Sequence, residues 1–389
     1  MESKIKIAFV SQFYRYYYKR IFELLSQRYD IDFFFFGGDM SIRRIPPDIR
    51  ECWGKLGNFK GKYLKGFYLL PNLRITPTLI FKLFFGKYDI FIKCHNGRFA
   101  LPVTFFIAKL LNRPFILWTE IWHHPETFFH KFSFYLMKKI YRDSHAICAS
   151  GEAVKEYLLS LGIDQRKIFV APPAVENSLY EKEPSEEEIE YIKNQLGIKD
   201  KKIILYVGRF VEFKGAVYLL EAFGNLNRRD TVLLLIGEGP QGRYLKGLVK
   251  QKGLKDVFFL GNIPNKFLYK YYALADIFVL PSIKTKSAVE GWGIVINEAM
   301  NQGLPIIATE DVGAVRGGLV KNGVNGLIVP SRNAKSLKEA LEKLLSDENL
   351  RITLGNNSKE IIKNWTYDEM LEGFIKAIEY VKDNGYQRG

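Results

Sequence analysis

Short apolar runs alternate with amphipathic stretches along both halves of the chain. Apolar runs without a helical period predict buried strands, and apolar residues at three- and four-residue steps between them predict helices. In the first half, strands are expected at residues 5–11, 31–36, 88–93, 114–119, 145–149 and 168–171. Residues 37–73 are rich in Gly, Pro and Arg and predict irregular structure. This alternation is typical of an α/β fold with a doubly wound parallel sheet.

The alternation stops near the middle of the chain and then restarts. Pro172 and Pro173 interrupt it, and residues 181–190 carry six glutamates, which predicts an exposed helix or linker. In the second half, strands are expected at residues 202–207, 231–236, 257–260, 277–280, 305–308 and 326–329. The chain is therefore predicted to hold two Rossmann-like domains.

The expected domain boundaries follow from these patterns. The N-terminal domain is placed at residues 1–172, a linker at 173–200 and the C-terminal domain at 201–364. An amphipathic helix at 365–389 is expected to pack back toward the N-terminal domain. Open α/β sheets bind ligands at the carboxyl ends of their strands, so the site is predicted in a central cleft that both domains face.

The cysteines and the apolar runs indicate in which cellular compartment the protein is expected. The three cysteines, Cys52, Cys94 and Cys148, are scattered without a CxxC pair, as expected in a reducing cytoplasm. No signal peptide is expected at the N-terminus, and no run reaches the roughly 20 apolar residues that a membrane span needs. A cytoplasmic protein is predicted, with the inner face of the cell membrane as a candidate location.

Positive charge is concentrated in the N-terminal half. Residues 1–172 hold 27 Lys and Arg against 14 Asp and Glu, a net of +13, whereas the remainder holds 30 against 28, a net of +2. A general lysine-rich bias does not explain this asymmetry, and we expect an anionic partner such as a membrane surface. The candidate segments are Phe13–Arg20 and Gly61–Lys87, whose aromatic residues could equally be core residues beside solvated lysines.

Two glutamates, Glu290 and Glu298, bracket a Gly-x-Gly turn that opens an apolar, helix-like run. Such a turn presents free backbone N–H groups to an anion. With a helix from Ile294 onward, the carboxylates lie roughly 10 Å apart, at about 1.5 Å rise per residue. That span suits a nucleotide-diphosphate sugar, because carboxylates accept hydrogen bonds from hydroxyl pairs. Two solvated or capping glutamates would give the same spacing.

Further candidate groups follow other predicted strands of the second half. Arg209 and Lys214 come directly after the strand at 202–207 and could hold one diphosphate, or could be two exposed loop residues. Glycine-rich strand ends permit close backbone approach to a ligand, although a simple turn needs the same residues. These strand ends contain Gly208, Gly237 and Glu238. After the strand at 257–260, Asn262 and Ile263 could frame a nucleotide base.

Taken in order, these motifs resemble the nucleotide-sugar domain of glycosyltransferase family 4 (group 1), retaining enzymes of the GT-B fold. The series continues through Pro281-Ser282, Asn297-Glu298-Ala299-Met300, Gly303 to Pro305 and Asn325-Gly326. The resemblance covers residues 200–360 closely and the N-terminal half loosely, mainly at 146–150 and 162–172. It implies no required cofactor or metal, with a nucleotide-diphosphate sugar as donor substrate.

The resemblance also implies roles for individual residues. Arg209 and Lys214 correspond to the pair that holds the donor diphosphate, Glu290 to the glutamate at the donor sugar and Glu298 to the one that takes the ribose hydroxyls. Backbone N–H groups of the turn would contact sugar or phosphate. The residues of this turn are Gly291, Trp292, Gly293 and Ile294.

The N-terminal half matches the family less well. Residues 11–15, which include Arg15, take the place of a glycine-rich loop, and this leaves the acceptor-side contacts open. The family often places a histidine beside the donor sugar, and the register allows either Glu120 or His123 to occupy that position. A metal site at His123-His124 is not expected, because no third ligand is spaced nearby. His95, at another strand end, is a further candidate for substrate contact.

The predicted function is transfer of a sugar from a UDP- or GDP-linked donor to a glycan or lipid-linked acceptor in cell-surface polysaccharide, glycolipid or glycoprotein assembly. The resemblance implies a retaining, metal-independent hexosyltransferase. Two alternatives remain: a GT-B synthase with a soluble sugar acceptor, and a non-catalytic polyanion-binding protein. No specific nucleic-acid module is recognisable, and a basic surface alone binds nucleic acid nonspecifically.

Overall fold

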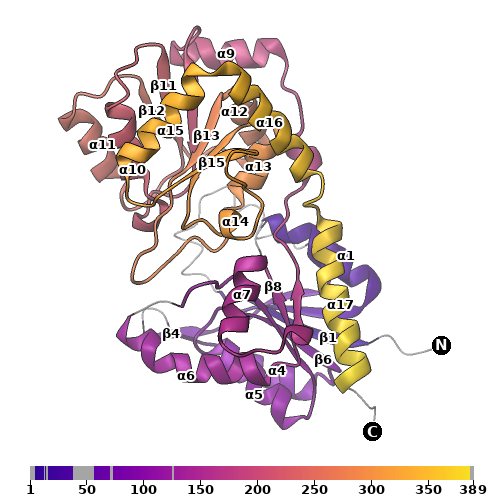
Figure 1. The fold of residues 1–389 in the computed structure, drawn as a ribbon. Helices are drawn as coiled ribbons and strands as arrows, with labels where there is room; N and C mark the ends of the chain where they lie inside the picture. Colours follow the sequence, from indigo (N-terminus) through magenta and orange to yellow (C-terminus); the bar gives the residue numbers. More distant parts are fainter. Residues whose placement is uncertain are drawn as a thin grey trace. The chain divides into compact units, whose positions relative to one another are not determined.

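The structure is a computed structural model that describes residues 5–12, 14, 16–37, 57–70, 73–124 and 127–385. The chain divides into two compact units (Figure 1). Unit 1 comprises Met1–His124, Phe128–Pro173 and Tyr367–Gly389, and unit 2 comprises Pro125–Thr127 and Ala174–Thr366. Each unit is an α/β domain built on a parallel sheet.

Unit 1 contains a seven-stranded parallel sheet with the order β3-β2-β1-β6-β7-β8-β9. Its strands are β1 (Lys6–Ser11), β2 (Asp30–Phe35), β3 (Gly61–Tyr63), β6 (Ile90–Cys94), β7 (Phe115–Thr119), β8 (Ala146–Ala149) and β9 (Ile168–Val170). The strand order runs outward in both directions from β1 and β6, so the chain changes direction between these two strands. A separate antiparallel hairpin is formed by β4 (Phe67–Leu70) and β5 (Leu73–Ile75).

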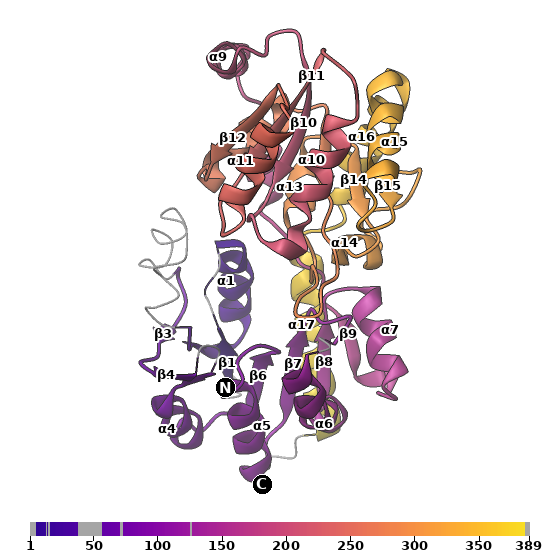
Figure 2. The ribbon, with the colours of Figure 1, turned by 90° about the vertical axis from the view of Figure 1, so that its left-hand side faces the viewer.

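Helices cover both faces of this sheet (Figure 2). One core contains buried residues of α4, α5, α6 and α7, and α1 with α17 packs on the opposite face. The helices of unit 1 are η1 (Tyr16–Tyr18), α1 (Lys19–Arg28), α4 (Pro77–Phe85), α5 (Ala100–Leu110), α6 (Phe128–Asp143), α7 (Glu152–Ser160), η2 (Gln165–Lys167) and α17 (Tyr367–Gly385).

The last helix is part of the first unit's core. α17 packs against β8, β9 and α1, and the Tyr367 hydroxyl donates a hydrogen bond of 2.7 Å to the Tyr17 carbonyl. The Phe374 ring lies 5.4 Å from that of Trp118 and 6.0 Å from that of Phe9, measured between ring centroids. Aromatic burial therefore joins the end of the chain to its first strand.

Unit 1 differs from the sequence expectations in the region between β2 and α4. Part of the region predicted as irregular forms β3, β4 and β5. β3 is an edge strand of three residues, too short for a periodic pattern, and its neighbour β2 holds the flanking chain: Phe33 N–H donates to the Lys60 carbonyl at 2.8 Å. Residues 38–56 lie outside the described residues.

Unit 2 contains a six-stranded parallel sheet with the order β12-β11-β10-β13-β14-β15. Its strands are β10 (Lys202–Val207), β11 (Thr231–Ile236), β12 (Val257–Gly261), β13 (Ile277–Leu280), β14 (Ile306–Thr309) and β15 (Gly326–Val329). Counted along the unit this order is 3-2-1-4-5-6, the doubly wound order of dinucleotide-binding domains. The chain changes direction between β10 and β13, the point at which such sheets bind ligands.

Helices on both faces bury the strands of this sheet in two apolar cores. The helices of unit 2 are α8 (Asn177–Tyr180), α9 (Glu186–Leu196), η3 (Glu212–Lys214), α10 (Ala216–Gly224), α11 (Gly242–Gln251), α12 (Asn265–Leu274), α13 (Val295–Asn301), α14 (Gly313–Arg316), α15 (Ala334–Ser346) and α16 (Glu348–Ile362). Both parallel sheets and their helical layers agree with the predicted α/β class.

The segment between the two predicted domains is largely helical. Helix α9 begins with a reciprocal capping box in which Ser185 and Glu188 each accept a hydrogen bond from the other's backbone N–H. Val175, Tyr180 and Ile198 are buried in a core of unit 2. The glutamate-rich stretch therefore lies on a helix anchored at both ends to unit 2.

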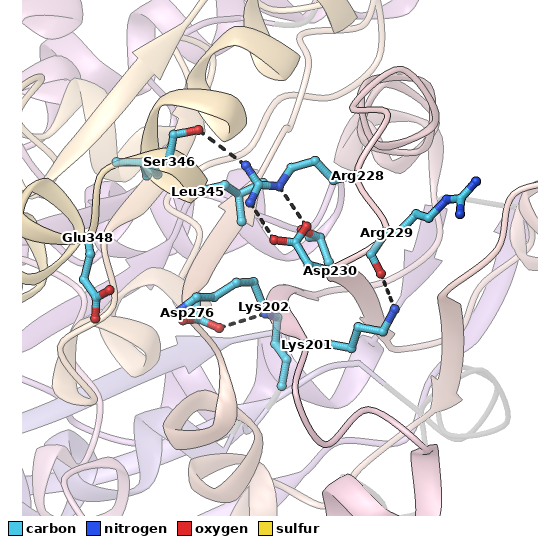
Figure 3. A network of polar contacts seen from close by, with 12 residues as sticks. Lys201, Lys202, Arg228, Arg229, Asp230, Asp276, Leu345, Ser346 and Glu348 are labelled. Carbon is cyan, nitrogen blue, oxygen red and sulfur yellow. Dashed lines mark hydrogen bonds and ion pairs between the residues drawn. The ribbon is translucent and has the colours of Figure 1, made fainter.

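A polar network closes the amino ends of the strands in unit 2 (Figure 3). Asp276 accepts the Ile203 N–H at 2.8 Å and pairs with the Lys202 ammonium at 3.2 Å. Arg228 holds the Asp230 carboxylate through two bonds of 2.9 and 2.6 Å, and this pairing holds the pKa of Asp230 at about 2. These ion pairs fasten the edge of the sheet opposite the strand ends at which ligands bind.

No helix in the described part of the chain is both long enough and apolar enough to cross a membrane.

The close approach of α17 to the sheet can be tested at Gly373. A Cβ there would overlap the Val170 carbonyl oxygen and the Ala171 backbone. We expect Gly373→Ala to lower the free energy of unfolding by about 1–3 kcal/mol through overpacking, measured as a shift of the urea midpoint. Gly247→Ala in α11 is the matched control, because no atom lies within 4 Å of its added Cβ. An equal or smaller loss at Gly373 than at Gly247 would contradict this packing.

Candidate active site

A lysine and a glutamate meet where the sheet of unit 2 changes direction. Lys214 ends the short helix after β10, and its Nζ lies 2.5 Å from Oε2 of Glu290, in the segment that follows β13. Ser282, directly after β13, donates its hydroxyl to the same oxygen at 3.1 Å. All three side chains are buried. A buried, hydrogen-bonded ion pair therefore occupies the ligand-binding edge of the doubly wound sheet.

Arg209 lies beside this pair but is exposed. Its guanidinium carbon is 5.9 Å from the centroid of the Phe213 ring, and the Lys214 ammonium is 6.0 Å from the same ring. The Tyr206 hydroxyl donates to the Arg209 carbonyl at 3.2 Å, which fixes the backbone at the end of β10. The two cations are thus placed around one aromatic ring, and only Arg209 presents its charge to solvent.

Glycines let the strand ends of unit 2 approach one another closely. Gly237 has φ of 132°, and a Cβ there would overlap the Gly208 carbonyl oxygen. Gly208 N–H donates to the Ile236 carbonyl at 2.9 Å, and Gly237 N–H donates to the Gly261 carbonyl at 2.7 Å. The sequence indicated close approach of a ligand at these glycines. In the structure, neighbouring backbone already makes Gly237 necessary.

The second glutamate is held inside unit 2. Glu298 lies in the first turn of α13 and accepts a hydrogen bond of 2.7 Å from the Tyr272 hydroxyl. Both side chains are fully buried, and this burial raises the pKa of Tyr272 well above its ordinary value. The hydroxyl therefore stays protonated and donates to the carboxylate across the physiological range.

The turn between the two glutamates is fixed by its own contacts. The Trp292 indole N–H donates to Asn297 Oδ1 at 2.8 Å, and the Trp292 carbonyl accepts from Ala314 N–H at 2.7 Å. Gly293 has φ of 93°, and a Cβ at Gly313 would overlap the Gly291 carbonyl. Ile294 is the N-cap residue of α13. The turn is therefore a tightly packed connection that leads into the N-terminus of α13.

The remaining residues predicted for the donor lie at the ends of β11 and β12. Glu238 is exposed, and its backbone carbonyl accepts the Phe210 N–H at 2.9 Å. Asn262 and Ile263 follow β12 and are half-buried, with Ile263 packed against the apolar core. These three residues extend the same edge of the sheet beyond the Lys214–Glu290 pair.

Unit 1 has a polar cavity of about 90 Å³ at the equivalent position, between the ends of β1 and β6. It is lined by Ser11, Tyr18, Cys94, His95, Asn96, Trp118 and Glu120. Glu120 Oε1 accepts from the Tyr18 hydroxyl at 2.9 Å, and His95 Nδ1 accepts the Glu120 N–H at 3.4 Å.

The candidates of the N-terminal half are therefore not equivalent. Glu120 and His95 come together in this cavity, whereas His123 is not among its lining residues and its ring lies 6.2 Å from that of Trp122. Of the two residues that the register allowed, Glu120 lines this cavity and His123 does not. Arg15 lies outside the described residues.

A buried lysine supports the loop that lines this cavity. The Lys93 ammonium donates to the Cys94 and Asn96 carbonyls at 2.6 and 2.7 Å and lies 4.6 Å from the centroid of the Phe36 ring. Burial lowers the pKa of Lys93 to about 7. Lys93 thus positions the backbone of the loop that carries His95.

Sequence reasoning missed several of these residues. Phe213 and Tyr272 contact predicted site residues but were not named from the sequence, and Ser282 was named within a motif without a role. Tyr272 lies on α12, apart in sequence from its partner Glu298, whereas Phe213 directly precedes Lys214. Lys93 could have been found, because a lysine inside an apolar strand is unusual. Among the described residues, no group of three or more His, Cys, Asp and Glu is arranged to hold a metal ion.

Comparison with known proteins identifies the family. Residues 188–361 match the family model described as Glycosyl transferases group 1, and residues 15–179 match the one described as Glycosyltransferase Family 4. The capsular polysaccharide biosynthesis glycosyltransferase CapM of Staphylococcus aureus is 30% identical over 311 residues, which cover 76% of this chain and 77% of CapM. The chain belongs to glycosyltransferase family 4 (group 1).

Other relatives of this family 4 chain match mainly through part of their length. The GDP-mannose-dependent alpha-(1-6)-phosphatidylinositol monomannoside mannosyltransferase of Mycobacterium tuberculosis is 30% identical over 206 residues, which cover 51% of this chain and 52% of the relative. The chain spans about half the length of several other curated relatives that it matches.

Solved structures establish the fold. The crystal structure of Anabaena HepE in complex with UDP has a TM-score of 0.76 at 19% identity, covering 97% of this chain and 100% of that one. At this identity the likeness concerns the fold, which is of GT-B type with two Rossmann-like domains. The fold class predicted from the sequence is therefore confirmed.

The buried Tyr272–Glu298 hydrogen bond gives a stability prediction. Tyr272→Phe removes the donor and leaves a buried carboxylate oxygen with one partner fewer, so we expect a loss of about 1–3 kcal/mol in the free energy of unfolding. Tyr218→Phe, at a half-buried tyrosine of α10, is the control. Equal stability of the two variants in urea unfolding would argue against this bond.

The lowered pKa of Lys93 gives a pH prediction. Between about pH 7 and the ordinary lysine pKa, the unfolded chain binds a proton at Lys93 that the folded chain releases, so stability should rise with pH in this window. We expect the melting temperature of the wild type, relative to that of Lys93→Met, to increase from pH 7 to pH 9. Parallel pH profiles for the two proteins would refute a buried neutral amine.

Proposed function

We propose that this chain is a retaining glycosyltransferase that moves a sugar from a UDP- or GDP-linked donor to a glycan or lipid-linked acceptor. The observation that carries the proposal is the buried Lys214–Glu290 pair of 2.5 Å at the ligand-binding edge of unit 2. Family membership supports the same chemistry. The HepE structure with the same fold is described as a complex with UDP.

In this proposal the donor binds along the edge formed by β10, β11 and β13. Its diphosphate lies near Arg209 and Lys214, because a guanidinium fork and a mobile ammonium suit phosphate oxygens. Glu290 accepts hydrogen bonds from hydroxyls of the sugar, and Glu298 from those of the ribose. Backbone groups of Gly291 to Ile294 contact the sugar or phosphate. Gly208, Gly237, Glu238, Asn262 and Ile263 frame the nucleotide.

The ion pair suggests what changes when the donor arrives. In the structure, the Lys214 ammonium is paired with the Glu290 carboxylate. A diphosphate would offer Lys214 an anionic partner, and the Glu290 carboxylate would then be available to sugar hydroxyls. The two residues are in this way held ready for a ligand that carries phosphate at one end and hydroxyls at the other.

The proposed chemistry is departure of the nucleoside diphosphate through an oxocarbenium-like transition state. Arg209 and Lys214 neutralise the charge that develops on the leaving phosphate, and no metal ion is required. The acceptor attacks from the face that the diphosphate leaves, and a departing phosphate oxygen takes the acceptor proton. The configuration at the anomeric carbon is therefore retained.

The acceptor side is assigned to the cavity of unit 1. His95 is assigned to hydroxyl groups of the acceptor, and Glu120, which shares its cavity, keeps the role beside the donor sugar that the resemblance implies. Relatives described as a capsular polysaccharide transferase and a phosphatidylinositol monomannoside mannosyltransferase support a glycan or lipid-linked acceptor. The corresponding location is the cytoplasmic face of the cell membrane, with an anionic lipid surface as partner.

Two other functions would make different predictions. A synthase with a soluble sugar acceptor shares the donor chemistry but gives no role to the +13 charge of residues 1–172. A non-catalytic polyanion-binding protein would bind anions in a salt-sensitive manner without turning over any nucleotide sugar. The buried Lys214–Glu290 pair, which a surface for polyanions does not need, favours an enzyme.

Donor binding is tested first by a thermal-shift screen of UDP, GDP, ADP and their common sugars, with and without chelator. A ligand that binds the native state raises the melting temperature by mass action. We expect a clear increase with UDP or GDP that chelator does not change. If no nucleotide raises the melting temperature, the proposed donor site is wrong. If chelator abolishes the increase, donor binding requires a metal ion and the proposed metal independence is wrong.

The leaving-group role is tested by Arg209→Ala and Lys214→Ala. We expect each to lower kcat by about 10²–10³-fold, the usual loss when one preorganised charge or donor is removed. Lys250→Ala, at an exposed lysine of α11 in the same unit, should leave the rate unchanged. Near-normal rates in both site variants would be incompatible with the assignment.

A further inference from the structure

Exposed apolar side chains are concentrated in one part of unit 1. Of the seventeen large apolar residues exposed among the described residues, ten lie between Tyr63 and Leu110. Nine of these lie on β4, α4 and α5, and they define what we call the apolar face. Its members are Phe67, Leu69, Leu70, Ile80, Phe81, Phe84, Phe85, Phe106 and Leu110.

Helix α4 is apolar on both its sides. Leu79 and Leu83 are fully buried in the core, one turn apart. On the outer side, Phe81 is 63% exposed and Phe85 is 71% exposed, again one turn apart. A helix that only covered a sheet would present polar residues outward. The outer side of α4 therefore indicates an apolar contact beyond the core of this unit.

The three elements of the apolar face are neighbours. β4 pairs with β5, which is followed after one residue by α4, and α4 packs against α5. Figure 2 shows β4 and α4 next to one another in unit 1, with α5 close to α4. The exposed aromatic and aliphatic side chains thus belong to one contiguous region of the surface.

The same segment is strongly basic. Residues 57–113 contain ten Lys and Arg against a single acid, Asp89. Lys62 and Lys65 are exposed beside the start of β4, Lys87 is exposed just after α4, and Lys109 lies between Phe106 and Leu110 on α5. The net charge of +9 in 57 residues makes up most of the +13 of the N-terminal half.

We propose that the apolar face docks on an anionic lipid bilayer. Aromatic and leucine side chains would enter the boundary between headgroups and acyl chains, while the surrounding ammonium groups contact lipid phosphates. Lysine suits this position because its apolar stem lies along the acyl boundary and its charge reaches the headgroups. The proposal rests on the proposed function only in its purpose, which is to bring the enzyme to a lipid-linked acceptor.

A lipid surface fits these observations better than a protein partner. Apart from Thr78, the exposed side chains of the three elements are apolar or cationic, whereas a protein interface would be expected to include more acidic or neutral hydrogen-bonding groups. Bilayer binding adds apolar burial to attraction by anionic headgroups, and the segment supplies both. Each Lys or Arg near an anionic membrane contributes about 1 kcal/mol, which increases the membrane-bound fraction relative to the free fraction by about fivefold.

The experiment is co-sedimentation of the full chain with vesicles of phosphatidylcholine alone or mixed with phosphatidylglycerol. We expect binding to the mixed vesicles that weakens as salt is raised. Phe81→Ser/Phe85→Ser should weaken it by about tenfold or more through lost apolar burial. Lys62→Gln/Lys65→Gln should weaken binding to the mixed vesicles by about 25-fold, at about fivefold for each charge, and reduce the preference for anionic lipid.

Matched controls lie on unit 2, away from the apolar face. Tyr244→Ser/Ile352→Ser removes two apolar residues of similar exposure, 58% and 53%, and Lys252→Gln/Lys335→Gln removes two exposed lysines. Both double variants should bind vesicles like the wild type. Equal binding to neutral and anionic vesicles, or a loss in the controls as large as in the apolar-face variants, would overturn the proposal.

A second copy of the chain is the competing occupant. If Phe81→Ser/Phe85→Ser dissolves a dimer in analytical ultracentrifugation and leaves vesicle binding unchanged, the face belongs to a self-association interface and the proposal is wrong. The nucleotide thermal shift, measured on the same variants, should equal that of the wild type. Vesicle binding without any nucleotide-induced thermal shift would contradict the transferase function but not the docking. A nucleotide-induced thermal shift without vesicle binding would contradict the docking but not the transferase function.

Discussion

The carboxyl ends of parallel strands decide where chemistry can occur in this chain. Each strand of a doubly wound sheet delivers its next loop to the same edge, and the loops diverge where the strand order reverses. In unit 2 that point lies between β10 and β13, and the loops after these strands bring Lys214, Ser282 and Glu290 together. In unit 1 it lies between β1 and β6, where the polar cavity is found. The polar network around Asp276 and Arg228 secures the opposite edge of unit 2, so the binding edge can remain irregular.

The Lys214–Glu290 pair shows how charge is kept at such an edge before a ligand arrives. An isolated buried lysine or carboxylate would be costly, and each residue removes that cost for the other. The Ser282 hydroxyl adds a further donor to the carboxylate. A diphosphate sugar carries both an anion and hydroxyls, so it offers replacement partners to both residues. The arrangement is compatible with tight ligand binding because both buried charges have a partner in the Lys214–Glu290 pair and would also have one in a complex with the donor.

Much of the architecture was predictable because it depends on local patterns. Buried parallel strands are continuous apolar runs, and all twelve predicted runs correspond to strands of the structure, such as β10 and β11. The edge strand β3 was missed because it has three residues and is held by its neighbour β2. Arg209, Lys214, Glu290 and Glu298 could be named from the order of motifs. The partner of Glu298 could not, because Tyr272 lies on a different helix and meets Glu298 only in the folded chain. That Glu120 and not His123 lines the cavity of unit 1 depends on the path of the chain after β7, which the sequence does not specify.

The position of α17 has a consequence for how the chain folds during synthesis. Unit 2 is formed almost entirely by one uninterrupted segment, Ala174–Thr366, whereas unit 1 needs Tyr367–Gly389 to cover β8 and β9. The ribosome therefore releases the helix that completes the first unit only after the whole of the second unit has been made. Until then, Trp118 and Phe9 lack the Phe374 ring that packs on them. The N-terminal domain, although translated first, is the last to close its core, and its unfinished apolar surface makes the nascent chain a natural client for chaperones.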